Sequence, residues 1–140
     1  MKRYCLIAIP AFLFMLVSCG KGGFPTIPSL TFKNIGPGAV HPGDSVQIVC
    51  SFKDREGNIQ DSVYFRASNS SVYGTYAMPN FPAQSNMEGN ILLELYSGTD
   101  FTPPAGAGAV DTIYFYVFIK DLSGKSSDTV KTSSILSYGG

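Results

Sequence analysis

The same outline occurs twice in this chain, as KDREGNIQDSV over residues 53–63 and as KDLSGKSSDTV over residues 120–130. Both copies read K-D-x-x-G-x-x-x-D-[S/T]-V, and each follows a segment in which apolar and polar side chains alternate. Asp suits the first position of a β-turn and Gly suits its fourth. Each copy therefore predicts a β-hairpin, with one strand entering the turn and a second strand leaving it.

The composition also points to strands and turns. Aromatic residues make up 13% of the chain, Trp is absent, and there are 15 Gly and 9 Pro, which favours an all-β fold. Alternation and turn residues predict strands over residues 30–35, 45–52, 62–66, 91–96, 111–120 and 129–135, with one or two short edge strands near 72–77. Residues 68–90 otherwise predict a long loop. Strands at this spacing predict a β-sandwich of about seven strands.

The first 18 residues do not belong to this domain. Lys2 and Arg3 give a positive start, and residues 4–17 are uncharged and mostly apolar. This run is shorter than the roughly 20 residues that a membrane-spanning helix needs. Residues 1–18 therefore predict a signal peptide and an exported protein.

The signal ends in Leu16-Val17-Ser18-Cys19, which resembles the lipobox of bacterial lipoproteins. The resemblance implies that the signal is cut before Cys19, that the Cys19 thiol carries a diacylglycerol, and that the freed amine is acylated. The partner of this anchor would be a membrane, and Gly20 after the cysteine favours the outer membrane over the inner one. Residues 19–29 are rich in Gly and Pro and predict a tether to a domain over residues 30–140. The alternative is an ordinary cleaved signal with a chance cysteine.

Only Cys50 then remains as a free thiol, because Cys5 leaves with the signal and Cys19 carries lipid. Cys50 lies on an apolar face with Val46, Ile48 and Phe52, which favours a small buried side chain. The alternative is a reactive thiol, but no His or basic cluster lies nearby in the sequence to lower its pKa.

Longer patterns resemble the bacterial immunoglobulin-like domains of exported proteins. These patterns are the Pro-Gly-Asp-Ser-Val that begins at Pro42, the Phe-x-Asp-x-x-Gly-x-Ile segment that begins at Phe52, and the Asp-x-x-Gly turn at Asp121. The resemblance implies an immunoglobulin-like β-sandwich. It does not imply a ligand, since such domains serve adhesion, spacing and binding alike.

Charge and motifs exclude several classes of function. Ten basic and ten acidic residues leave no net charge to attract nucleic acid. His41 is the only histidine and has no plausible catalytic partners in the sequence, and Glu88 and Glu94 have nothing that places them across a cleft. We therefore expect no enzyme activity and no cofactor.

A weak metal site is conceivable in the first repeat. Asp54, Glu56, Asn58 and Asp61 offer oxygen ligands that suit calcium. The spacing differs from that of an EF-hand loop, because Gly57 stands fourth and Phe65 stands twelfth. Turn formation is the favoured role for these residues.

The tripeptide Asp-[Ser/Thr]-[Val/Ile] occurs four times and resembles an O-glycosylation signal of some Gram-negative envelope proteins. The acceptor hydroxyls would be those of Ser45, Ser62, Thr112 and Thr129. The alternative is structural: Asp closes a turn, Ser or Thr begins a strand, and a β-branched residue enters the core.

Aromatic side chains form the clearest candidate binding surface. If the odd-numbered residues of 113–119 face the core, then Tyr114, Tyr116 and Phe118 point outward, and Tyr64 lies on the matching face of its own strand. Exposed rings of this kind suit a protein partner or a sugar. Two functions follow: an interaction or structural module that binds another envelope protein, or a carbohydrate-binding lipoprotein. The alternative is that residues 68–90 fold over the rings, with Tyr73, Tyr76 and Phe81 adding to the core.

Overall fold

The computed structural model describes residues 23–140. The predicted signal peptide, the cleavage site and Cys19 lie outside the described residues. Within residues 23–140 all regular structure is β-strand, in ten strands joined by turns and loops. The predicted all-β fold is confirmed.

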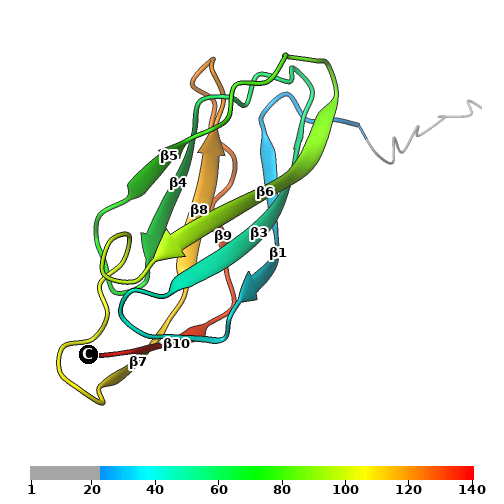
Figure 1. Ribbon diagram of the computed structural model, residues 1–140. Coiled ribbons are helices and arrows are strands. Elements are labelled where there is room, and N and C mark those ends of the chain that lie inside the picture. The colour runs from blue at the N-terminus through cyan, green and yellow to red at the C-terminus, as the bar shows by residue number, and fades with distance from the viewer. Residues whose placement is uncertain (1–22) are drawn as a thin grey trace, which may run out of the picture.

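Two antiparallel sheets face each other as a β-sandwich, and Figure 1 shows one sheet in front of the other. The front sheet has the order β1-β3-β6, formed by β1 (Ser29–Gly36), β3 (Ser45–Asp54) and β6 (Met87–Tyr96). The back sheet has the order β5-β4-β8-β9, formed by β4 (Ser62–Ala67), β5 (Gly74–Ala77), β8 (Phe115–Lys120) and β9 (Val130–Lys131).

A third, smaller sheet closes the end of the sandwich where the C-terminus lies (Figure 1). Its order is β2-β10-β7, formed by β2 (Ala39–Val40), β7 (Val110–Ile113) and β10 (Ile135–Tyr138). Strand β2 runs parallel to β10, and β7 runs antiparallel to it. Residues 23–29, the described part of the predicted tether, enter at the end of the sandwich opposite the C-terminus.

The predicted strands are confirmed with four differences. The short strand β2 was not predicted. Strand β6 begins at Met87, inside the predicted loop, and the predicted final strand is divided into β9 and β10. The predicted strand over residues 111–120 is interrupted at Tyr114, which exchanges hydrogen bonds with Ser68. Ser68 N donates to Tyr114 O (2.8 Å), and Tyr114 N donates to Ser68 Oγ (3.2 Å). The chain changes from the small sheet to the back sheet at this residue.

The core lies between the two large sheets and follows the predicted alternation. On β3 the inward residues Val46, Ile48, Cys50 and Phe52 are buried, and on β8 the inward residues Phe115, Val117 and Ile119 are buried. Apolar burial of this kind contributes about 25 cal/mol per Å² of area removed from water. The intervening residues of each strand therefore face away from the core.

One of the two predicted hairpins is wrong. The second repeat joins β8 to β9 within one sheet and is a hairpin, as predicted. The first repeat joins β3 to β4, which belong to different sheets, so its turn crosses the end of the sandwich. Ile59, in the middle of this crossing, is fully buried and anchors it to the core.

The two repeat turns are capped in the same way. Asp54 and Asp121 are both buried, and each accepts a backbone amide four residues later: Asn58 N to Asp54 Oδ2 (3.2 Å) and Lys125 N to Asp121 Oδ1 (2.7 Å). The turns also contact each other, because Leu122 N donates to Asn58 O (2.8 Å). The repeat is therefore a pair of adjoining turns at the tether end of the domain.

The turn glycines give a matched test of this arrangement. Gly57 and Gly124 both have positive φ, 65° and 85°, but a Cβ at Gly57 would collide with the carbonyl of Gln84, whereas a Cβ at Gly124 would meet nothing within 4 Å. We expect Gly124→Ala to lower the free energy of unfolding by about 1–2 kcal/mol through left-handed strain. Gly57→Ala should cost at least about 1 kcal/mol more, because of overpacking. Urea denaturation of both variants measures this, and equal losses would contradict it.

Burial also predicts the reactivity of Cys50. The side chain is 2% exposed, and burial raises the pKa of its thiol to about 11. In a variant with both Cys5→Ala and Cys19→Ala we expect no reaction with a thiol reagent at pH 8 until urea unfolds the domain, because the reactive thiolate is scarce and inaccessible. Rapid labelling of the folded protein would show that Cys50 is an accessible thiol.

Candidate interaction surface

The four predicted aromatic residues lie together on the outer face of the back sheet. Strands β4 and β8 are neighbours, and Tyr64 pairs with Phe118 across them. Tyr116 pairs with Arg66 on β4 and with Lys131 on β9, so these cations lie on the same face. We call this surface the aromatic-cationic face; its residues are Tyr64, Arg66, Tyr114, Tyr116, Phe118, Lys120 and Lys131.

The rings on this face contact one another in two pairs. Tyr64 and Phe118 stack with their centroids 4.6 Å apart and their planes 1° from parallel. Tyr114 and Tyr116 meet edge to face at 5.3 Å. Their hydroxyls are 3.4 Å apart, and this hydrogen bond is the largest cause that raises the pKa of Tyr116. All four residues are partly buried, and their outer edges remain at the surface.

Three cations lie over three of these rings. The Lys131 ammonium is 3.9 Å from the centroid of Tyr114, and the Arg66 guanidinium is 4.6 Å from that of Tyr116. The Lys120 ammonium is 5.5 Å from the centroid of Tyr64. Cations at such distances are attracted by the negative face of an aromatic ring. The contacts hold the long side chains against the sheet and leave positive charge at its surface.

The charge on this face has one sign. Strands β4, β5, β8 and β9 contain no Asp or Glu, whereas β4, β8 and β9 supply Arg66, Lys120 and Lys131. The sequence reasoning found the rings but missed the cations. The same alternation could have found them, since Arg66 is two residues after Tyr64 and Lys120 is two residues after Phe118.

Residues 68–90 do not cover the aromatic-cationic face. Their contacts with it are at its margin: Tyr73 meets Phe118 edge-on at 5.4 Å and lies 5.3 Å from the Arg66 guanidinium, which donates to Ser70 O (2.7 Å). Tyr76 instead stacks on Phe65 at 5.4 Å and donates a hydrogen bond to Asp100 (2.7 Å), which raises the pKa of Tyr76 to about 12. Phe81 packs against the edge of the core. The predicted outward orientation of the four rings is therefore confirmed.

The three carboxylates of the predicted calcium site are not grouped together, although Asp54 and Asn58 are in contact. Asp54 Oδ1 and Asn58 Oδ1 are buried without a hydrogen-bond partner among the described residues. Asp54 is buried and caps its turn, which confirms the role that the sequence favoured for it. Glu56 is bound by the ammonium of Lys125 (2.9 Å), and the backbone carbonyl of Asp61 accepts Met78 N (3.2 Å). Asn58 joins the two turns through its backbone. Within residues 23–140, no group of three or more His, Cys, Asp and Glu side chains is arranged to hold a metal ion.

The four predicted glycosylation positions differ in accessibility. Thr112 and Thr129 are exposed, whereas Ser45 and Ser62 are partly buried. The Ser45 hydroxyl lies on the outer face of the front sheet and donates a hydrogen bond to Glu94 Oε1 (2.9 Å). Glycosylation stays a prediction, with Thr112 and Thr129 as the more accessible acceptors.

The residues considered for catalysis lie in separate, solvated places. His41 stacks on Tyr138 with their ring centroids 4.7 Å apart, and its Nδ1 lies 3.6 Å from Asp44. Glu88 pairs with Lys53 (3.1 Å) on the outer face of the front sheet. Glu94 is on that same face of β6, so it does not oppose Glu88 across a cleft.

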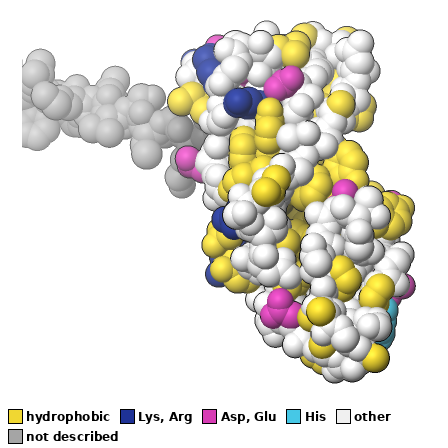
Figure 2. All heavy atoms as spheres, turned by 90° about the vertical axis from the view of Figure 1, so that its left-hand side faces the viewer, with side chains coloured by type: hydrophobic (Ala, Val, Ile, Leu, Met, Phe, Trp, Pro, Cys, Tyr) yellow, Lys and Arg dark blue, Asp and Glu magenta, His cyan; other side chains and the backbone are white. Residues whose placement is uncertain are grey.

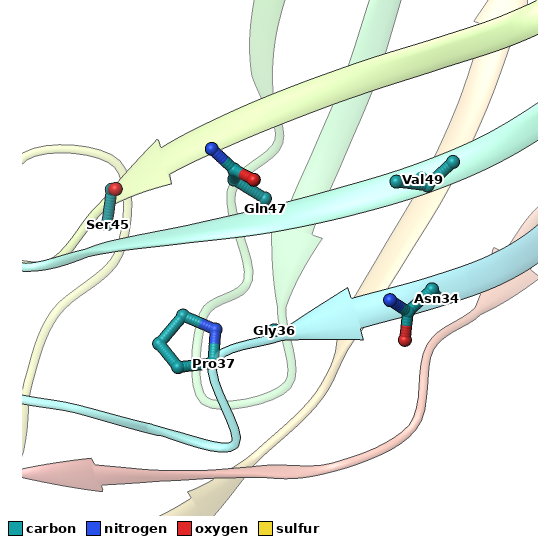
Figure 3. A pocket seen from close by; sticks show the side chains of 6 residues that line it. All are labelled: Asn34, Gly36, Pro37, Ser45, Gln47 and Val49. Carbon is teal, nitrogen blue, oxygen red and sulfur yellow. The ribbon is translucent and has the colours of Figure 1, made fainter.

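A shallow depression lies on the outer face of β1 and β3. Figure 3 shows its lining side chains, which rise from two neighbouring strands around the bare backbone of Gly36: Asn34, Pro37, Ser45, Gln47 and Val49. Its polar groups are amides and a hydroxyl, with no ionisable side chain in the lining. It offers hydrogen bonds to a ligand but no acid, base or nucleophile beyond a serine that is already bonded to Glu94.

Comparison with protein families, with curated proteins and with solved structures gave no match. None of the elements in residues 23–140 is an apolar helix long enough to cross a membrane. The candidate site in the described domain is the aromatic-cationic face, where rings and cations from three strands lie together.

Proposed function

We propose that this protein is a bacterial envelope lipoprotein whose domain binds another envelope protein through the aromatic-cationic face. The anchor rests on the sequence, which has a short apolar signal ending in Cys19. The domain has no arrangement of groups that favours catalysis, so binding or spacing is the function that its geometry supports. The observation that carries the proposal is the alternation of half-exposed rings with cations on one sheet.

We also propose that the fold is immunoglobulin-like. The support is the strand order, because β1-β3-β6 corresponds to strands A, B and E of such a domain and β4-β8-β9 to strands C, F and G. Strand β5 takes the place of a C′ strand beside β4. In this class of domain the sandwich is a scaffold, and binding surfaces are side chains placed upon it.

The chemistry of the face indicates an acidic partner. Three cations and no carboxylate project from its four strands, and aromatic rings and Arg are the side chains most enriched at binding hot spots. Complementary charge steers association and selects partners. The partner surface should therefore carry Asp or Glu around an apolar centre, and binding should weaken as salt screens these charges.

Carbohydrate binding is the second candidate. Sugars stack on open ring faces, whereas each of the four rings here already has a neighbour over one face: Phe118 on Tyr64, Tyr64 on Phe118, Arg66 on Tyr116 and Lys131 on Tyr114. These neighbours reduce the flat area available to a sugar ring. The face therefore favours a protein partner over a glycan.

Photo-crosslinking in intact cells tests the proposal. With a photoreactive amino acid at position 116, we expect one dominant protein adduct, identified by mass spectrometry. The same residue at position 47, exposed on the outer face of the front sheet, is the control and should not give that adduct. In the position-116 background, Lys131→Glu should reduce the adduct yield severalfold, and Lys33→Glu on β1 should leave it unchanged.

The same adduct from positions 47 and 116, or no adduct from either, would contradict binding through the aromatic-cationic face. Saturable binding on a glycan array that is lost in Tyr116→Ala would instead support the carbohydrate candidate.

The anchor has its own test in palmitate labelling of bacteria that express the full chain. We expect the label to be incorporated into the wild-type protein and into Cys50→Ala, and to be lost in Cys19→Ala. Two or three acyl chains are needed for lasting attachment, since each buried methylene contributes about 0.8 kcal/mol. Label that persists in Cys19→Ala, or that is absent from the wild-type protein, would refute lipidation at this residue.

A further inference from the structure

Strand β6 has a free edge from Glu88 to Glu94. It is the last strand in the order β1-β3-β6, and it pairs with β3 over ten residues without a register shift. Ser97 N donates to Asp44 O (2.9 Å), which sets the alternation of this antiparallel ladder. The odd-numbered residues of β6 therefore bond to β3, and the amides and carbonyls of Asn90, Leu92 and Glu94 face the free edge.

At the C-terminal end of β6, the backbone groups that face away from β3 are hydrogen-bonded within the chain. Tyr96 N belongs to the same even-numbered series, and it donates to the carboxylate of Asp100 (2.7 Å). No other strand in residues 23–140 pairs with this side of β6. Natural proteins usually protect a long edge with charged side chains, Pro or a bulge. Strand β6 has no Lys, Pro or bulge, and its two charged residues, Glu88 and Glu94, are bonded to Lys53 and Ser45 on β3.

An apolar groove runs beside this edge, between the two sheets. It has a volume of about 170 Å³ and is lined by side chains from both sheets, among them Val63, Tyr76, Met78, Ile91 and Leu93. Figure 2 looks at this side of the molecule and shows hydrophobic side chains gathered along it. Leu92 and Tyr96 on β6 are 61% and 44% exposed. Unpaired backbone next to exposed apolar surface is the arrangement that accepts an added strand.

We propose that this edge binds β6 of a second copy of the chain, in an antiparallel two-fold pair centred on Leu92. The residues of β6 whose amides and carbonyls face the free edge are even-numbered. In an antiparallel pair with a two-fold axis perpendicular to the sheet, even-numbered residues of one copy lie opposite even-numbered residues of the other. Centring on Leu92 places Leu92 opposite Leu92, Asn90 opposite Glu94, and Glu88 opposite Tyr96. Centring on Ile91 would instead place Glu88 opposite Glu94 twice, which like-charge repulsion disfavours.

The inward residues of β6 complement the groove in the same register. Ile91 of one copy lies opposite Leu93 of the other, on the side of the sheet where the groove opens. Each copy thus adds an apolar side chain to the groove of its partner, and the two contacts are equivalent by symmetry.

The pair has a consequence for binding. Because the axis is perpendicular to the sheets, the aromatic-cationic faces of both copies point in the same direction and stay open. Two such faces side by side bind a partner with repeated acidic surfaces more tightly than one face does. This consequence rests on the proposed function, but the pairing of β6 does not.

Disulfide crosslinking of the full chain in intact cells tests the pair, in a Cys50→Ala background. Leu92→Cys should give a covalent dimer under mild oxidation, because position 92 meets itself at the axis. Val72→Cys, which is more exposed (73% against 61%) but lies away from β6, should not. Asn90→Cys combined with Glu94→Cys should also crosslink, which checks the register.

Leu92→Lys provides the disruptive variant, with Val72→Lys as its control. In detergent-extracted protein studied by analytical ultracentrifugation, Leu92→Lys should weaken self-association at least about ten-fold, because two cations then face each other at the axis. The position is exposed, so the variant should fold. A chain that stays monomeric in the wild type, or equal crosslinking at positions 72 and 92, would overturn the proposal, whatever the outcome at position 116.

Discussion

Burial of every second side chain of β3 and β8 between the two sheets is the constraint on which the rest of this structure depends. Val46, Ile48 and Cys50 face Phe115, Val117 and Ile119 across the core. Since side chains alternate in a strand, this burial leaves the intervening residues of β8 no place except the outer face. A shift of the register by one residue would bury Lys120 and expose Ile119, so the orientation of the aromatic-cationic face is coupled to the stability of the core.

The two copies of the repeat show how one local sequence serves two connections. In both, a buried Asp accepts the amide four residues later and a glycine takes a left-handed conformation. The second copy returns into its own sheet, whereas the first crosses to the other sheet because Ile59 enters the core. Capping chemistry therefore determines the turn, and the apolar residue after it determines where the next strand goes. The contact between the turns ties both sheets together near the tether.

The two proposed binding surfaces use different physics on different parts of the sandwich. The aromatic-cationic face is made of side chains that point away from a fully paired sheet, so its specificity lies in charge and ring geometry. The β6 edge is made of backbone groups that the sheet itself leaves unpaired, with an apolar groove beside them. One surface suits a partner of opposite charge and the other suits a strand of the same kind, and occupying one leaves the other accessible.

The sequence by itself determined the all-β class, most strand positions, the burial of Cys50 and the outward orientation of Tyr64, Tyr116 and Phe118, because these follow from local alternation and turn residues. It did not place the crossing after β3, the interruption at Tyr114 or the early start of β6. Those depend on which strands pair, and pairing is decided by contacts between residues far apart in the chain. The free edge of β6 is of the same kind: a strand is an edge only because no other strand lies beside it, and no local pattern carries that information.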